Sequence, residues 1–181
     1  LKSLSDQLTL IPVLELDTYY LLWFLKAEVH RYRSQYHEAE ECYDKTYIEA
    51  EKRHDFLGMS KALEGKAKIY LDTIQPHQAE KLLYEAIEAR EKSISSEAEK
   101  AKLYYLLSEN LLNSGKSTNA EKWLQKAKKY CPSILDGSIQ ARLYLRTGRF
   151  EEAKRFLLHQ KKELSSKNGT ELPKSHRETD L

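Results

Sequence analysis

Small residues recur in pairs that are twelve positions apart along this chain. The pairs are Ala27 with Ala39, Ala67 with Ala79, Ser108 with Ala120, and Ala141 with Ala153. Each stands in a stretch whose apolar residues are spaced by three or four positions, which is the period of a helix. Small side chains let two helices approach to the roughly 8–10 Å of ordinary helix packing. The spacing therefore predicts helical hairpins, and repeated hairpins bury their core between neighbouring units.

Turn-forming residues divide the helical stretches at the places where hairpins need connections. The expected helices cover residues 17–32, 36–53, 56–71, 76–92, 97–112, 118–130, 133–145 and 149–162. Breakers such as Gln75-Pro76 and Ser114-Gly115 separate them. We expect an all-α array over 17–164 and a disordered polar tail over 165–181. Residues 1–16 are expected to be the remnant of a preceding repeat or an N-terminal cap, with Leu4, Leu8 and Ile11 at helical spacing.

Composition narrows the class of protein and its partners. The chain has 181 residues, of which 32% are charged and 40% hydrophobic, as in a soluble helix-rich protein. A net charge of +2 gives no strong pull on nucleic acid or on a membrane surface. No apolar run approaches the roughly 18 residues of a membrane span, so we expect no membrane insertion and a cytoplasmic location. Because residue 1 is leucine, we expect a piece of a longer protein.

The hairpins resemble the tetratricopeptide repeat family over residues 17–162. Its W-x2-L-G-x2-Y then A-x3-F pattern is matched in part by Trp23-x2-Lys26-Ala27 and by Ala39-x3-Tyr43, and residues 147–153 resemble the family's turn into its second helix. The resemblance implies a right-handed superhelical solenoid of antiparallel hairpins with about four repeats. It also implies a non-catalytic module that binds a protein or peptide within a larger regulatory or scaffolding protein.

The repeat length departs from the usual 34 residues of this family. Equivalent small residues are separated by 40 positions between Ala27 and Ala67, by 41 between Ala67 and Ser108, and by 33 between Ser108 and Ala141. Only the third repeat has a proline, Pro132, that stops its second helix. The second helices of the first two repeats are therefore expected to continue for extra turns. Long repeats of this kind resemble the repeat arms of bacterial regulators, such as maltose-type signal-transduction ATPases and peptide-sensing Rap-like proteins.

The resemblance also suggests which residues face a partner, because the first helix of each pair lines the inner groove in this family. The residues expected there are Phe24, Glu28, Arg31, Tyr32, Lys61, Glu64, Lys68, Lys102, Tyr105, Glu109, Asn113, Arg142 and Arg146. A face that mixes both charges with aromatic rings suits an extended or helical peptide. The alternative interpretation is that these are ordinary solvated helix faces.

Other functions are less well supported by the residues. The family's chaperone-binding members hold a carboxylate with lysine-asparagine and lysine-arginine pairs, and the corresponding positions, among them Glu64 and Lys68, do not reproduce these pairs. The basic fourth hairpin, with Arg142 and Arg146, leaves an RNA-binding helical array as the competing function. RNA binding should weaken steeply with added salt. Peptide binding should instead depend on Tyr32, Tyr105 and Lys68.

Catalytic and metal-binding patterns are incomplete in this sequence. Ser114-Gly115-Lys116-Ser117 ends like a phosphate-binding loop but lacks its first glycine, and no metal-ligand spacing is found, so we expect no enzyme activity, cofactor or metal. The two cysteines, Cys42 and Cys131, predict neither a disulfide nor a zinc site. The last residues, with Thr179 and Leu181, match a possible C-terminal PDZ ligand.

Overall fold

The structure is a computed structural model that describes residues 19–131 and 137–168. These ranges contain helices and turns and no strand. The helices are α2 (Tyr19–Tyr32), α3 (Tyr36–Lys52), α4 (Phe56–Asp72), α5 (Pro76–Lys92), α6 (Glu97–Asn113), α7 (Ser117–Tyr130), α8 (Gly137–Arg146) and α9 (Phe150–Asn168). From α3 to α7, both ends of each helix lie within one residue of the expected position. Helix α9 continues past residue 164, into the segment expected to be a polar tail.

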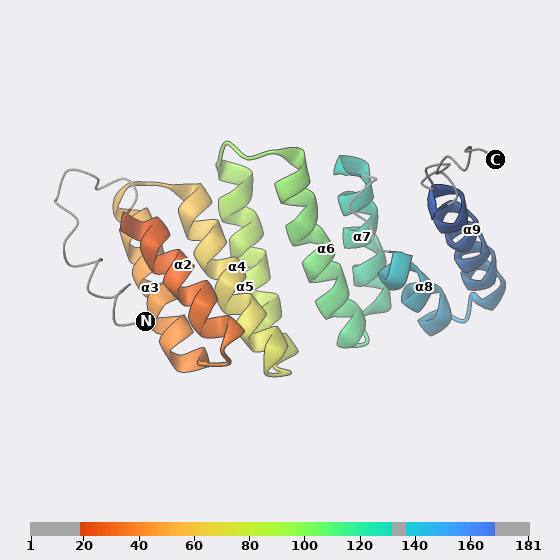
Figure 1. Ribbon diagram of the computed structural model, residues 1–181, viewed down its shortest axis with the longest axis horizontal. Coiled ribbons are helices and arrows are strands. Elements are labelled where there is room, and N and C mark those ends of the chain that lie inside the picture. Colours follow the sequence, from red (N-terminus) through yellow and green to blue (C-terminus); the bar gives the residue numbers. More distant parts are fainter. Residues whose placement is uncertain (1–18, 132–136, 169–181) are drawn as a thin grey trace, which may run out of the picture. The chain divides into compact units, whose positions relative to one another are not determined.

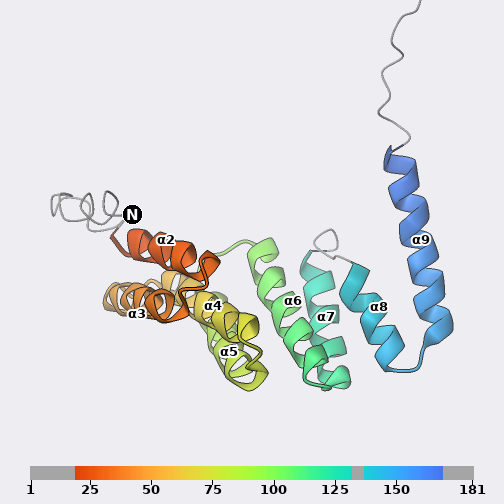
Figure 2. The ribbon, with the colours of Figure 1, turned by 60° about the horizontal axis from the view of Figure 1, so that its bottom comes forward.

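The chain divides into two compact units, residues 1–135 and 136–181. In the first, α2 packs on α3, α4 on α5, and α6 on α7, while contacts of α3 with α4 and of α5 with α6 join successive hairpins. Figures 1 and 2 show these six helices following one another in chain order as antiparallel pairs. In the second unit, α8 packs on α9. The expected all-α fold of consecutive helical hairpins is confirmed.

All eight paired small residues are buried, as the spacing predicts. The pair on α6 and α7 is also joined by a hydrogen bond, since the Ser108 hydroxyl donates to the carbonyl of Ala120 over 2.7 Å. Successive hairpins also come close to each other at Gly65 on α4. A Cβ atom there would collide with the ring of Tyr43 on α3. A large side chain at any of these contacts would force the helices apart.

Five of the turns share one backbone conformation, including the turn between α3 and α4. The middle residue of each has a positive φ: 57° at Ser34, 54° at His54, 58° at Ile74, 79° at Gly115 and 74° at Gly148. The residue after each of these donates its N–H to a carbonyl five residues earlier, for example Gln75 to Tyr70 over 2.7 Å. This is the Schellman motif, which satisfies the last carbonyls of a helix and reverses the chain.

Helix starts and lengths also follow from local residues. The Asp55 carboxylate accepts hydrogen bonds from the backbone N–H groups of Leu57 and Gly58 at the start of α4. At the start of α6, Ser96 and Glu99 form a reciprocal capping box. Helices α3 and α5 have 17 residues, whereas α7 has 14 and ends just before Pro132.

Candidate functional site

Five of the expected groove residues line one hollow in the first unit. Phe24 comes from α2, Lys61, Glu64 and Lys68 come from α4, and Lys102 comes from α6. The hollow, called the lysine hollow below, has a volume of about 190 Å³. That is smaller than the roughly 300–1,000 Å³ of a typical small-molecule pocket. It has room for a side chain or a chain terminus of a partner.

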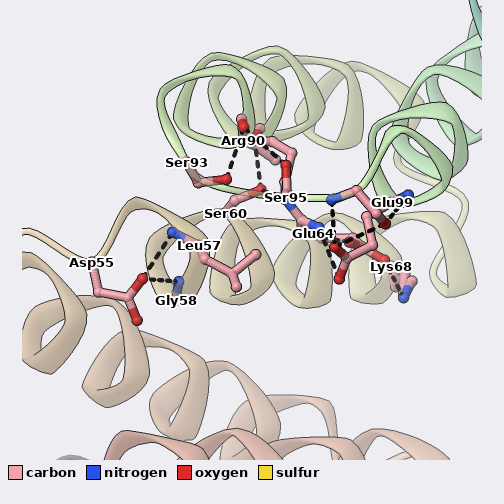
Figure 3. Close-up of polar contacts among 12 residues, drawn as sticks. Asp55, Leu57, Gly58, Ser60, Glu64, Lys68, Arg90, Ser93, Ser95 and Glu99 are labelled. Carbon is pink, nitrogen blue, oxygen red and sulfur yellow. Dashed lines mark hydrogen bonds and ion pairs between the residues drawn. The ribbon is translucent and has the colours of Figure 1, made fainter. Parts of the chain in front are cut away.

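The lysine hollow is also lined by Arg90 from α5 and Glu99 from α6. Neither was among the groove residues expected from the sequence. Arg90 is only 3% exposed, and its Nε donates to the Ser60 hydroxyl over 2.9 Å. Its two terminal nitrogens lie 3.5 Å from a Glu64 oxygen and 3.9 Å from a Glu99 oxygen. Figure 3 shows Arg90 between these partners, so one buried guanidinium joins α4, α5 and α6.

The carboxylates of the lysine hollow already have cationic partners. Glu64 accepts a hydrogen bond from Lys68 over 2.7 Å and pairs with Arg90. The pKa of Glu99 is lowered by hydrogen bonds from Ser96 and by the charges of Arg90 and Lys61. Among the described residues, no carboxylate lies within ion-pair distance of Lys61 or Lys102. With four cations and two anions, the lining has an excess of positive charge.

A second hollow continues from Lys68 along α4 and α6. It has a volume of about 320 Å³ and is lined by Lys68, Leu71, Asp72, Leu106, Glu109 and Asn113. Leu71, Asp72 and Leu106 were not selected from the sequence, whereas Glu109 and Asn113 were. Because Lys68 borders both hollows, they form one continuous surface, called the groove face below.

Two expected groove residues serve mainly to join helices. Arg31 donates to Asp72 of α4 over 2.9 Å and to Glu28 over 3.4 Å, and Glu28 also accepts a hydrogen bond from the Tyr43 hydroxyl. Burial opposes the charge of Arg31, but the bonds with Asp72 and Glu28 outweigh it and raise its pKa. Glu28 and Arg31 therefore hold α2 against α3 and α4. Tyr32 differs, because its ring is 78% exposed beside the Arg31 guanidinium.

The remaining expected residues are not brought to the hollows. Tyr105 is half-buried on α6 and lines neither hollow. Arg142 and Arg146 lie on α8 in the second unit, so they are described only within their own hairpin. Thr179 and Leu181 lie outside the described residues, as do residues 1–16. Within the described ranges, no group of three or more His, Cys, Asp or Glu side chains is placed to hold a metal ion. None of the helices described is both long and apolar enough to span a membrane.

The sequence does contain an indication that Arg90 is buried. Arg90 follows Ala86, Ile87 and Ala89 on the apolar face of α5, and the equivalent position of α3 is Ala50. A charged residue in an apolar stripe is rarely buried without partners. Its partners come from helices that follow and precede it, which helical periodicity alone does not identify.

Repeated short helical hairpins around buried small residues define a helical-repeat protein. Residues 101–134 match the family model described as tetratricopeptide repeat, a range that contains α7 and most of α6. The α6–α7 hairpin thus matches the tetratricopeptide repeat, as the resemblance to that family predicts. A match to this repeat indicates a protein-interaction module.

A solved structure supports the same fold over most of the chain. The crystal structure of BtubC (BKLC) from P. vanneervenii is similar with a TM-score of 0.73 and 17% sequence identity. The similarity covers 92% of this chain and 71% of that protein's chain. At this identity the similarity shows the fold alone. No curated protein is significantly similar in sequence.

Proposed function

We propose that this chain is a non-catalytic, cytoplasmic module that binds a peptide segment of a partner protein on the groove face. The observation that carries the proposal is the composition of the lysine hollow. Lys61 and Lys102 point their charge at a hollow whose carboxylates are already paired, and the Phe24 side chain adds an apolar wall. A partner side chain or terminus with a carboxylate fits these properties, because a charge-assisted hydrogen bond is stronger than a neutral one.

The neighbouring surfaces suggest how a longer segment is held. Lys68 leads from the lysine hollow to the second hollow, where Leu71 and Leu106 offer apolar contact beside Glu109 and Asn113. An extended segment that places an acidic residue in the first hollow and an apolar residue in the second matches both linings. Regulation, signalling or scaffolding within a larger protein is the setting that we propose for this binding.

Charge reversal in the lysine hollow tests the proposal. The probe is a fluorescent random peptide library with a fixed central Asp-Glu, compared with the same library carrying Asn-Gln. We expect the acidic library to bind more tightly, and Lys61→Glu with Lys102→Glu to weaken its binding by about tenfold or more. The matched control is Lys81→Glu with Lys122→Glu, which changes the net charge equally at exposed positions of α5 and α7.

Other results would contradict a specific site. Equal loss in the control variant would mean that binding depends only on total charge. Equal binding of both libraries would exclude a preference for an acidic group. For the RNA alternative, a single-stranded RNA oligonucleotide should bind with steep salt dependence, and its binding should be lost in Arg142→Gln with Arg146→Gln.

A further inference from the structure

The junction between the second and third hairpins contains a buried charge that the junction between the first and second lacks. Arg90, in the last turn of α5, is only 3% exposed. Its equivalent on α3, counted from the paired small residues, is the fully buried Ala50. A Cβ atom added at Gly58 of α4 would lie 2.8 Å from the Cβ of Ala50. Arg90 and Glu99 occupy these same two positions in the next junction.

This comparison shows that the repeat does not need a charge at the position of Arg90. An alanine beside a glycine is enough to pack α3 against α4. A buried charge is costly by comparison, because its loss of hydration must be offset by well-placed partners. Arg90 is therefore better explained by the hollow that it lines than by the packing of the hairpins.

Arg90 is fixed through both its side chain and its backbone. Its Nε donates to the Ser60 hydroxyl over 2.9 Å, and that hydroxyl donates to the Ala86 carbonyl over 2.7 Å. Ser60 is itself fully buried. The backbone carbonyl of Arg90 accepts a hydrogen bond from the Ser93 hydroxyl over 2.8 Å. The guanidinium therefore stays between its partners, as Figure 3 shows.

The two carboxylates of the lysine hollow are the groups that this fixed charge acts on. Arg90 lies within ion-pair distance of both Glu64 and Glu99. The charge of Lys61 also acts on Glu99. Without Arg90, the nearest remaining cations would be the lysines of the lining. Those lysines would then serve the protein's own carboxylates, and an acidic group entering the hollow would be repelled.

We propose that Arg90 determines the specificity of the lysine hollow for an acidic group, an inference that rests on the proposed function. Arg90 pairs with Glu64 and Glu99 from the buried side. Lys61 and Lys102 then keep their charge for the carboxylate of a partner. Arg90 is thus a positioning residue, which acts through the two carboxylates of the lining.

A double-mutant cycle tests this role with the acidic and the Asn-Gln peptide libraries. The measured quantity is the ratio of their affinities, because a merely structural residue would weaken the binding of both alike. We expect Arg90→Met to lower the ratio by about fivefold or more. In a background of Glu64→Gln with Glu99→Gln, Arg90→Met should change it by less than about twofold, since no carboxylate is left to hold.

Two further variants control for charge and for folding. Arg53→Met removes an arginine that pairs with Glu49 on α3 over 3.4 Å, outside both hollows, and should leave the ratio unchanged. Arg90→Lys is a milder variant, for use if Arg90→Met does not fold. Its single ammonium can hold only one carboxylate, so the ratio should fall by a smaller factor. Hydrogen exchange in α4–α6 reports whether each variant is folded.

Three results would overturn the role of Arg90. One is an unchanged ratio in a folded Arg90 variant. Another is an equal fall with and without the two glutamates, since Arg90 would then act on the partner by its own charge. The third is an equal fall in Arg53→Met, which would leave only an effect of total charge. In each case a preference of the unaltered chain for the acidic library still supports the proposed function, whereas the absence of that preference refutes both.

Discussion

Single side chains decide how closely the helices of this protein approach. Ser108 and Ala120 are both fully buried between α6 and α7, and the Ser108 hydroxyl donates to the Ala120 carbonyl. Between hairpins, Gly65 leaves room for the buried Tyr43 ring. Gly65 has no space for an added carbon, as expected in protein interiors, which are packed as densely as organic crystals.

Enlarging one of the paired small residues should be costly. We expect Ala120→Leu to lower the free energy of unfolding by about 2 kcal/mol or more, since the added methylenes must push α6 and α7 apart. Lys122→Leu adds an apolar side chain to the exposed face of the same helix and should change it by less than about 0.5 kcal/mol. Urea unfolding of the two variants measures the difference, and an equal effect would refute close packing at Ala120.

Several turns of this chain have the same backbone geometry but are built from different residue types. Five turns contain a residue with positive φ, and only Gly115 and Gly148 among them are glycines. Left-handed backbone conformations crowd the Cβ atom of other residues, most of all a β-branched one. Ile74 is such a residue, with a φ of 58° and an 87% exposed side chain. Its turn is therefore held by the hydrogen bonds of the flanking helices.

Exchanging residue types between two of these turns should shift stability in opposite directions. Ile74→Gly is expected to raise the free energy of unfolding by about 0.5–1 kcal/mol, because it relieves backbone strain and removes little contact. Gly115→Ala is the converse change and should lower it by about 1 kcal/mol. Thermal unfolding with calorimetry tests both. A loss of stability in Ile74→Gly would show that the exposed side chain makes a contact of its own.

Ion pairs distributed over the first unit make its stability depend on pH. Glu49, Glu91 and Glu99, on α3, α5 and α6, all have a pKa below the ordinary 4.5. For Glu91 the main cause is a hydrogen bond from Lys126, joined by one from the Tyr104 hydroxyl, so the carboxylate links its hairpin to the next. The folded protein therefore holds these protons less tightly than the unfolded chain does.

Acid should weaken the fold in a defined range of pH. A carboxylate with a lowered folded-state pKa stabilises the fold above its unfolded-state pKa and loses this effect as the pH falls through the folded-state value. We expect the free energy of unfolding to decrease below about pH 4.5, and Glu91→Gln to reduce that slope. Urea titrations from pH 7 to pH 3 measure it, with Glu38→Gln as a control for the change of charge. An unchanged slope in Glu91→Gln would contradict the role of this pair.

Helix positions, turns and buried small residues were predicted from local sequence, and the groove residues in part. Phe24, Lys61, Glu64, Lys68 and Lys102 line one hollow. Phe24 and Glu64 occupy equivalent positions on α2 and α4, and Lys61 and Lys102 occupy equivalent positions on α4 and α6. Glu28 and Arg31 were expected to contact a partner, but most of their bonding joins α2 to its neighbours. Helical periodicity predicts which residues share one face of a helix. It does not predict whether the charged residues on that face form ion pairs with one another or with a neighbouring helix.

The local sequence determined the helical hairpins, because helical spacing, turn-forming residues and buried small residues act between positions that are close in the sequence. The hollow lined by Lys61 and Lys102 and the buried Arg90 depend on contacts between residues far apart in sequence. Arg90 illustrates the reason. Its partners Ser60 and Glu64 precede it by 30 and 26 positions. A buried charge is satisfied only when packing brings such groups within hydrogen-bond distance, and that packing is a property of the assembled helices.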